Sequence, residues 1–132
     1  MGYGAYGWYH VQFLPTGYIM DHEEAESSRR LVLKFIGELT RSYNVDPNRV
    51  YLMGFSQGCI MSLAAALTEP RKFAGVVGMS GRMLPELTPK IAPPEQLAGL
   101  PVMIVHGTYD NVLSIDLGRA IREDLELSLI HI

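Results

Sequence analysis

The hydrophobic and polar positions of the chain follow a helical period from about residue 21 to residue 43. Apolar side chains recur there three to four positions apart, which predicts an amphipathic helix. The predicted apolar stripe consists of Leu31, Phe35, Ile36, Leu39 and Tyr43. Asp21, followed three positions later by Glu24, forms the capping-box pattern and is expected to be the N-cap. Arg29 and Arg30 are expected on the solvated face of this helix.

Three short apolar runs predict buried strands over residues 50–53, 73–79 and 101–105. Helical patterns follow the first and third runs, over about residues 57–67 and 115–125, and a proline-rich loop with one short helical turn separates the second run from the third. This alternation predicts an α/β fold class, with a short parallel sheet flanked by helices on both faces. Ligands of such sheets bind beyond the carboxyl ends of the strands, so the residues that follow the three runs are the candidates for chemistry.

The first twenty residues differ from the rest of the chain. They contain no Lys, Arg, Asp or Glu, and they hold six of the twelve aromatic residues. A charge-free segment rich in glycine and aromatic residues is typical of a loop that lies on a surface. We therefore expect a loop that covers part of the core.

Composition narrows the function classes. The chain has 132 residues, enough for one domain, and its 48% hydrophobic and 19% charged content excludes a disordered tail. A net charge of −3 gives no basic footprint for nucleic acid, and no apolar run is long enough to span a membrane. No signal peptide is visible, so a cytoplasmic location is expected, with a lost signal peptide left open. The single cysteine excludes an internal disulfide framework and a cysteine-based zinc site, and no metal or cofactor constellation is visible.

The segment Gly54-Phe55-Ser56-Gln57-Gly58 stands between the first predicted strand and the helix that follows it. G-x-S-x-G in this position predicts a sharp turn that presents the serine hydroxyl above the sheet, with both glycines leaving room for the turn. The helix N-terminus favours a developing negative charge, and the backbone N–H of Gln57 can donate to an oxyanion. Ser56 is therefore predicted to be a catalytic nucleophile.

Candidate residues also follow the other two predicted strands. Asp110 stands after the third strand, and an acid there fits the chain order Ser, Asp, His of a catalytic triad. Asp116 is the competing acid, but it lies in the predicted helix. After the second strand, Met83 and Leu84 are candidate apolar contacts of a substrate pocket, and an ordinary loop is an equal alternative.

These segments resemble the carboxylesterase, phospholipase and acyl-protein thioesterase family of α/β-hydrolases. The resemblance rests on residues 51–58 (YLMGFSQG), 79–81 (MSG) and 106–110 (HGTYD), and it covers nearly all of residues 7–126. Trp8 resembles an aromatic position that the family carries before the predicted helix, which makes it a candidate pocket residue. The resemblance implies a partial α/β-hydrolase fold, no cofactor, and a serine esterase that forms an acyl-enzyme at Ser56 from esters or thioesters of short to medium acyl chains.

The resemblance also implies that two parts of a family domain are missing. These are the earlier strands, with a His-Gly loop that supplies a second oxyanion donor, and a late histidine of the triad. We therefore expect residues 1–126 to be a hydrolase domain truncated at both ends. Residues 127–132 (LSLIHI) are expected to be a non-native tail, because a common sequencing-adapter end, CTGTCTCTTATACACATC, translates to the same residues in a metagenomic read.

Four histidines are candidates for the base that the serine needs. The resemblance implies a structural role for His106, which precedes the candidate acid on the same strand. His10 and His22 stand before the first predicted strand and would reach Ser56 only through an unusual fold. His131 has the right chain order and is the candidate substitute base, although the helix before it carries the chain roughly 16 Å away from the active-site end of the sheet.

Two functions follow from the sequence. The first is a serine ester hydrolase impaired by truncation, because a serine without its base is a weak nucleophile. The alternative is a catalytically inactive α/β-hydrolase fragment that self-associates. The strand at 51–53 is expected at an open apolar edge, so a homodimer or higher oligomer is expected, in which residues 8–13 could add to a sheet. Cys59 is expected to be a small core residue.

Overall fold

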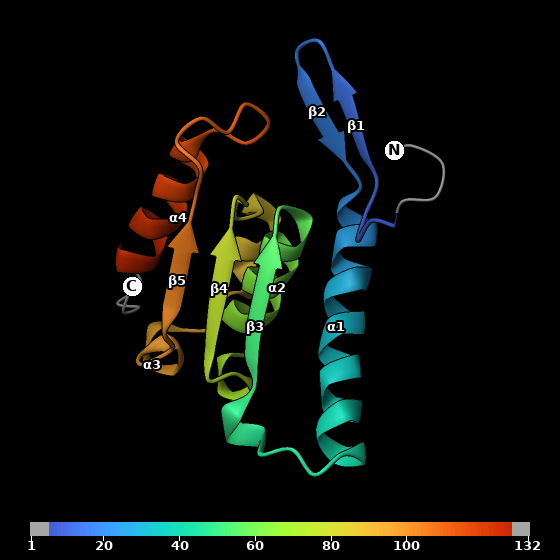
Figure 1. The fold of residues 1–132 in the computed structure, drawn as a ribbon, viewed down its shortest axis with the longest axis vertical. Coiled ribbons are helices and arrows are strands. Elements are labelled where there is room, and N and C mark those ends of the chain that lie inside the picture. The colour runs from blue at the N-terminus through green and yellow to red at the C-terminus, as the bar shows by residue number, and fades with distance from the viewer. Residues whose placement is uncertain (1–5, 128–132) are drawn as a thin grey trace.

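The chain folds as helices packed on a three-stranded parallel sheet, with a separate β-hairpin near the N-terminus (Figure 1). The computed structural model describes residues 6–127. Its strands are β1 (Val11–Leu14), β2 (Gly17–Met20), β3 (Tyr51–Phe55), β4 (Gly75–Met79) and β5 (Val102–Val105). Its α-helices are α1 (His22–Ser42), α2 (Gln57–Thr68), α3 (Pro94–Leu97) and α4 (Ile115–Leu127), and its 3-10 helices are η1 (Pro47–Arg49), η2 (Pro70–Lys72) and η3 (Pro85–Lys90).

The three predicted strands form one sheet in the order β3-β4-β5, and both pairs are parallel. The predicted α/β fold class and short parallel sheet are therefore confirmed. The bounds of these strands and of α1, α2 and α4 lie within two residues of the predicted ones. The proline-rich segment between β4 and β5 holds two short helices, η3 and α3, where one turn was expected.

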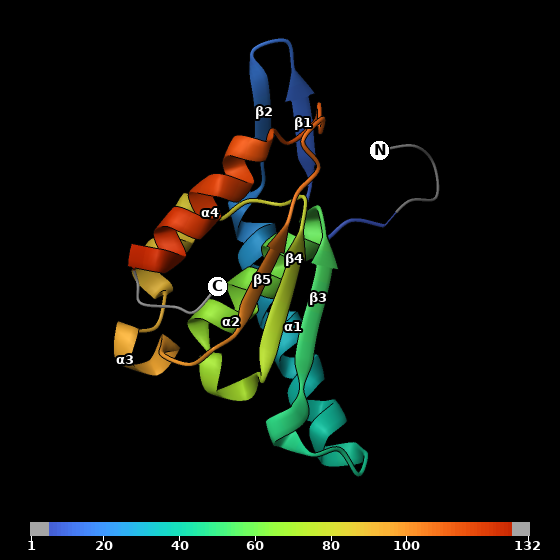
Figure 2. The same ribbon diagram turned by 60° about the vertical axis from the view of Figure 1, so that its left-hand side comes forward.

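The hydrophobic core lies on one face of the sheet, under α2 and α4. Leu63 of α2 and Ile121 and Leu125 of α4 are buried there against Val76 and Val102 of the strands. Figure 2 shows these helices on the same side of the strands. Both connections, β3 to β4 and β4 to β5, step in the same direction, and right-handed crossovers that step in one direction lie on one face. Within residues 6–127, helices therefore cover one face of the sheet, whereas the sequence predicted helices on both.

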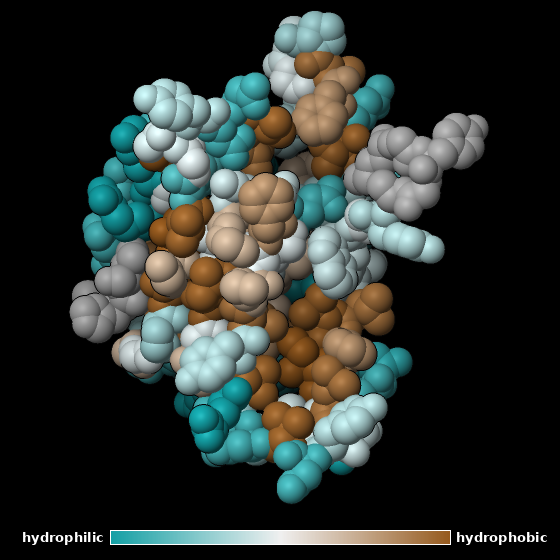
Figure 3. Space-filling model, viewed as in Figure 1, coloured by the Kyte–Doolittle hydropathy of each residue, from teal (hydrophilic) through white to brown (hydrophobic). Residues whose placement is uncertain are grey.

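The opposite face of the sheet, called the bare face below, presents large apolar side chains to solvent. They are Tyr51, Met53 and Phe55 of β3 and Met103 and Val105 of β5, and each is between 43% and 73% exposed. Figure 3 shows apolar side chains gathered over these strands and over the neighbouring helix α1. Strand β3 also lies at the edge of its sheet, without a hydrogen-bonded strand on its outer side in the described residues.

The N-terminal segment forms a hairpin instead of the predicted loop. Strands β1 and β2 pair with each other in antiparallel register, with Val11 opposite Met20 and Phe13 opposite Tyr18. Gly17 has φ +137°, a conformation that favours glycine, and it begins β2 directly after the turn. Within the described fold β1 pairs with β2 alone, so residues 8–13 join neither edge of the three-stranded sheet of the same chain.

Helix α1 begins as the capping pattern predicts. The backbone N–H of Glu24 donates to Oδ1 of Asp21 at 2.9 Å. The Glu24 carboxylate does not complete a reciprocal capping box, because it accepts instead from the backbone N–H of His10 at 2.7 Å. The backbone N–H of Asp21 in turn donates to the carbonyl of His10 at 3.0 Å, so the helix start holds the base of the hairpin.

The buried face of α1 differs from the predicted stripe. Leu31, Phe35 and Tyr43 are exposed, whereas Ala25 and Leu33 are buried on the side that packs on α2. The prediction was wrong at these three positions because the helix carries two overlapping apolar stripes, and only one of them meets α2. Among the helices of residues 6–127, none combines the length and the apolar character that crossing a membrane requires.

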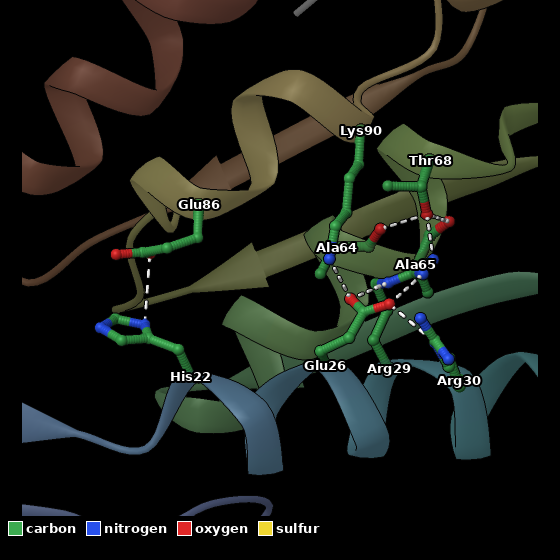
Figure 4. A network of polar contacts seen from close by, with 9 residues as sticks. All are labelled: His22, Glu26, Arg29, Arg30, Ala64, Ala65, Thr68, Glu86 and Lys90. Atoms are coloured by element: carbon green, nitrogen blue, oxygen red, sulfur yellow. Dashed lines mark hydrogen bonds and ion pairs between the residues drawn. The ribbon is translucent and has the colours of Figure 1, made fainter.

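A network of charges attaches α1 to the rest of the fold (Figure 4). Glu26 accepts two hydrogen bonds from Arg29, at 2.8 and 2.9 Å, and pairs with Arg30 at 2.8 Å and Lys90 at 2.9 Å. Arg29 also donates to the Thr68 hydroxyl of α2 at 2.8 Å. Hydrogen bonds from Arg29, followed by those from Lys90 and Arg30, hold the pKa of Glu26 far below its usual range. Arg30 is solvated as expected, but the prediction was wrong for Arg29, whose side chain is only 13% exposed.

Candidate active site

Ser56 occupies the turn between β3 and α2, at the carboxyl end of the sheet. Its backbone has φ 54° and ψ −117°, in the left-handed half of the map that residues other than glycine rarely enter. Its N–H donates to the carbonyl of Met79 at 2.9 Å, and its carbonyl accepts from Ile60 at 3.2 Å. The turn is therefore held by β4 on one side and by the first turn of α2 on the other. This is the strand-turn-helix context that the G-x-S-x-G pattern predicts.

The two glycines of the turn are not equivalent. A Cβ added to Gly54 would lie 2.1 Å from the carbonyl carbon and oxygen of Gly58, so the backbone leaves no space for a side chain there. A Cβ added to Gly58 would meet no atom within 4 Å. The expectation that both positions need glycine for room therefore holds for Gly54 but not for Gly58.

Cys59 packs the loop after β4 against the Ser56 turn. Its side chain is fully buried, as expected for a core residue. Its sulfur would lie 2.7 Å from a Cβ at Gly78 and 2.3 Å from a Cβ at Gly81. Both glycines thus leave space for the thiol, and a Cβ added to Gly81 would also lie 3.3 Å from the carbonyl oxygen of Ser56. Burial raises the pKa of the Cys59 thiol to about 11, which keeps it protonated and inert.

A cavity of about 370 Å³ opens beside Ser56, and we call it the Ser56 cavity. Its lining comprises Tyr6, Tyr9, Val11, Phe13, Tyr18 and Met20 from the N-terminal segment, Ser56, Gln57 and Ile60 from the turn and α2, and Arg82, Val112 and Leu113 from the loops after β4 and β5. The three residues predicted to line the pocket lie elsewhere. Leu84 is buried in the core, Met83 packs against the core, and Trp8 lines a neighbouring cavity beside the start of α1.

The side chain of Gln57 holds the N-terminal segment over the turn. Its Oε1 accepts from the backbone N–H of Trp8 at 2.9 Å, and its Nε2 donates to the carbonyl of Tyr9 at 3.0 Å. The Ser28 hydroxyl donates to the carbonyl of Trp8 from the other side. This role of the Gln57 side chain was not predicted, because only its backbone N–H follows from the turn pattern.

Asp110 lies in the loop after β5, as the strand order predicts. Its Oδ1 accepts from the backbone N–H of Leu113 at 2.9 Å and of Val112 at 3.0 Å. These hydrogen bonds, first that of Leu113, lower the pKa of Asp110, with smaller contributions from Ser80 and His106. The carboxylate is therefore ionised at neutral pH, in a loop that reaches the Ser56 cavity through Val112 and Leu113. The competing candidate Asp116 lies in α4 and pairs with Arg119 at 2.9 Å.

None of the described histidines lines the Ser56 cavity. The side chain of His106 is buried, its Nε2 lies 2.8 Å from the carbonyl oxygen of Leu113, and its ring packs against Gly118 of α4, which agrees with a structural role. His10 is exposed and pairs with Glu24, and His22 pairs with Glu86 at 3.3 Å. His131, the candidate substitute base, lies outside the described residues.

Several residues that line the Ser56 cavity were not predicted from the sequence. Val11 and Phe13 of β1, and Tyr18 and Met20 of β2, all face the cavity at alternate positions of the hairpin. That alternation, on either side of Pro15-Thr16, was the available signal. Arg82 carried no signal, because a single arginine in a loop is ordinary. In residues 6–127, no group of three or more His, Cys, Asp and Glu side chains is placed to hold a metal ion.

The chain is similar to known hydrolases along nearly its whole length. The family model described as Phospholipase/Carboxylesterase matches residues 1–131. Acyl-protein thioesterase 1 of Gibberella zeae is 30% identical over 133 residues, which cover 96% of this chain and 56% of the relative. Acyl-protein thioesterase 1 of Yarrowia lipolytica is 32% identical over 120 residues, which cover 88% of this chain and 51% of the relative. The chain thus spans about half the length of these curated relatives.

Solved structures show the same fold. SOBER1 of Arabidopsis thaliana superposes with a TM-score of 0.74 at 22% identity, over 94% of this chain and 60% of that one. The carboxylesterase of Bacillus cereus superposes with a TM-score of 0.72 at 24% identity, over 91% of this chain and 54% of that one. Together with the family match, these similarities show that the chain belongs to the phospholipase/carboxylesterase family of α/β-hydrolases.

Proposed function

We propose that this chain acts as a serine ester hydrolase on esters or thioesters of short to medium acyl chains. The observation that carries the proposal is the backbone of Ser56, held at φ 54° on a strand-to-helix turn that opens into the Ser56 cavity. A serine kept in this conformation presents its hydroxyl at the head of the sheet, where a substrate carbonyl can reach it. The family membership supports the same reaction class.

The proposed mechanism forms and then breaks an acyl-enzyme. The Ser56 oxygen bonds to the acyl carbon while the hydroxyl proton passes to a histidine imidazole. The backbone N–H of Gln57 stabilises the oxyanion, and Asp110 orients the imidazole and stabilises its charged form. The ester or thioester bond breaks, and the leaving alcohol or thiol takes the proton from the imidazole. Water then attacks the acyl carbon in the same way, which releases the acid and restores Ser56.

The mechanism needs a histidine beside Ser56, and no histidine of residues 6–127 lines the Ser56 cavity. We therefore expect slow turnover. In a serine protease, loss of the histidine alone costs on the order of a millionfold in rate. Loss of one oxyanion donor costs roughly a further 10²–10³. Since none of the described histidines lines the Ser56 cavity, His131 is the first histidine to examine.

Hydrolysis of 4-nitrophenyl acetate and butyrate tests the proposal. We expect turnover by the parent chain and none by Ser56→Ala above the buffer rate. The matched control is Ser42→Ala, an exposed serine at the far end of α1, which should hydrolyse at the parent rate. Covalent labelling by a fluorophosphonate, located by peptide mass spectrometry, should map to Ser56. Equal rates for the parent chain and Ser56→Ala would contradict the proposal, and replacing His10, His22 and His131 in turn identifies the base.

The second candidate function is self-association without catalysis, and the bare face favours it. Apolar side chains at alternate positions of β3 and β5 stay exposed, and the edge of β3 has unpaired backbone groups in the described structure. Open, apolar strand edges pair with other chains. A second copy offers an identical β3 edge, and a two-fold axis brings the two edges together. We propose that two copies pair in this way.

Light scattering over a concentration series tests self-association. We expect a dimer or larger species for the parent chain and a shift towards monomer for Met53→Lys and Phe55→Lys. Tyr109→Lys is the matched control, because Tyr109 is an exposed aromatic residue in the loop after β5, away from the bare face. A parent chain that stays monomeric at all concentrations would contradict the proposed self-association.

A further inference from the structure

Arg82 places a positive charge in a cavity whose other lining residues are uncharged. It follows Gly81, where an added Cβ would lie 3.3 Å from the carbonyl oxygen of Ser56, and it lines the same cavity as Ser56. Twelve residues within 6–127 line the Ser56 cavity, and among these Arg82 is the only Lys, Arg, Asp or Glu. The rest are mostly aromatic and aliphatic side chains from the hairpin and from α2.

The guanidinium of Arg82 is held by contacts that do not neutralise it. Its central carbon lies 5.1 Å from the centre of the Tyr18 ring, a cation–π contact. One terminal nitrogen lies 3.7 Å from the sulfur of Met20, which is a weak acceptor. Nε is buried without a hydrogen-bond partner, and in the described residues no carboxylate pairs with this side chain.

The lack of a carboxylate partner distinguishes Arg82 from Arg29. Arg29 is also partly buried, but it has a bidentate carboxylate partner in Glu26 and donates to the Thr68 hydroxyl. A charge that leaves water without a partner lowers stability, so arginines in such places normally bind a carboxylate or phosphate. Arg82 is held by Tyr18 and Met20, and among residues 6–127 it has no carboxylate partner.

We propose that Arg82 binds a negatively charged group on the substrate, so that the Ser56 cavity selects esters that carry a carboxylate or another anionic group. The inference rests on the proposed function, because it takes the Ser56 cavity to be the substrate site. The apolar lining holds the carbon chain of the ester, the acyl carbon lies at Ser56, and the anionic oxygens accept from the guanidinium. Neutral esters of the same shape bind the same lining without the charge-assisted hydrogen bonds.

Two pairs of probes locate the charge on the substrate. The first pair is the mono-4-nitrophenyl ester of glutaric acid and 4-nitrophenyl pentanoate, which differ by a carboxylate at the end of the acyl chain. The second pair is 4-acetoxybenzoate and methyl 4-acetoxybenzoate, which differ by a carboxylate on the alcohol side. We expect tighter binding and a higher kcat/KM for the anionic member of one pair, by about ten- to a hundredfold.

Binding is measured with Ser56→Ala as the parent, so that hydrolysis is not needed for the answer. In this background, calorimetry should show that Arg82→Met removes the preference for the anionic ester and leaves the affinity for the neutral ester unchanged. Arg71→Met, at an exposed position beyond the far end of α2, is the matched control and should keep the preference.

The outcomes separate this inference from the proposed function. If anionic esters bind through Arg82 but the chain with Ser56 does not hydrolyse them, the binding role stands and the proposed function fails. If Ser56 hydrolyses esters but Arg82→Met retains the same ratio between anionic and neutral probes, the role of Arg82 is overturned.

Discussion

The two faces of the parallel sheet are built from the same strands but have opposite surroundings. On β3, Leu52 and Gly54 point towards the helices, whereas Tyr51, Met53 and Phe55 point to solvent. On the covered face, Gly54 stands where the start of α2 comes close to the strand. The large side chains of β3 lie on the bare face. Burial on this sheet therefore depends on which way the connections step, and not on how apolar the strand is.

The two faces should also differ in how much their side chains contribute to stability. Residues on the covered face are closely packed against α2 and α4, so substitutions there should lower the free energy of unfolding strongly. Residues on the bare face have solvent on one side, so their truncation should cost little in the isolated chain. Three predictions test this contrast, in order of decreasing expected effect.

The largest effect is expected at Gly54, where the covered face meets the start of α2. Gly54→Ala places a Cβ 2.1 Å from backbone atoms of Gly58 and should lower the free energy of unfolding by about 4 kcal/mol or more. Gly58→Ala is the matched control, since its Cβ meets open space, and it should stay within roughly 1 kcal/mol of the parent. Urea unfolding followed by circular dichroism measures both. Equal stability of the two variants would show that the turn can shift to admit a side chain.

An intermediate effect is expected for truncation in the core of the covered face. Leu63 of α2 is 1% exposed, and Leu63→Ala should lower the free energy of unfolding by about 2–5 kcal/mol. Met53→Ala on the bare face should change it by less than about 0.5 kcal/mol. Both measurements belong at low protein concentration, where self-association does not contribute. A large cost for Met53→Ala under these conditions would mean that the bare face is covered within the single chain.

A smaller effect is expected where α1 joins the covered side through Glu26. Its pKa is lower in the folded chain than in the unfolded one, so the ionised carboxylate stabilises the fold above the unfolded pKa of about 4.3. That contribution is lost as the pH falls below this value towards the folded pKa. Glu26→Gln should therefore cost about 1–3 kcal/mol at pH 7, and the difference from the parent should narrow as the pH falls below 4.

The control for this prediction is Glu38→Gln on the same helix. Glu38 is exposed and pairs with Lys34 at 3.9 Å, so its loss should cost no more than about 1 kcal/mol. If Glu26→Gln costs no more than Glu38→Gln at pH 7, the network of Figure 4 does not stabilise the attachment of α1.

The features that the sequence predicted well depend on neighbouring residues. The cap at Asp21, the three strands and the turn at Ser56 each follow from a short pattern that is complete within a few positions. Helix and strand bounds were predicted closely for the same reason. The turn pattern also led to the family, which the comparisons confirmed.

The features that the sequence did not predict depend on residues far apart in the chain. Arg29 is held in the fold because Glu26 and Thr68 meet it from two helices, and no local pattern contains Thr68. The hairpin was not predicted, because the glycine-rich and aromatic composition of the first twenty residues indicated a loop more strongly than the alternation of apolar positions indicated strands. The bare face was not predicted, because a continuous apolar run does not show whether helices cover one face of the strand or both.

Gln57 separates the part of the Ser56 cavity that must stay fixed from the part whose sequence can change. Its side chain fixes the backbone of Trp8 and Tyr9, at the base of the hairpin, to the first residue of α2. The hairpin tip, with Phe13 and Tyr18, extends away from this anchor (Figure 1). Substitutions and insertions at the tip can therefore reshape the cavity without displacing the serine turn. The tip is the place to graft new sequences when the specificity of this scaffold is to be changed.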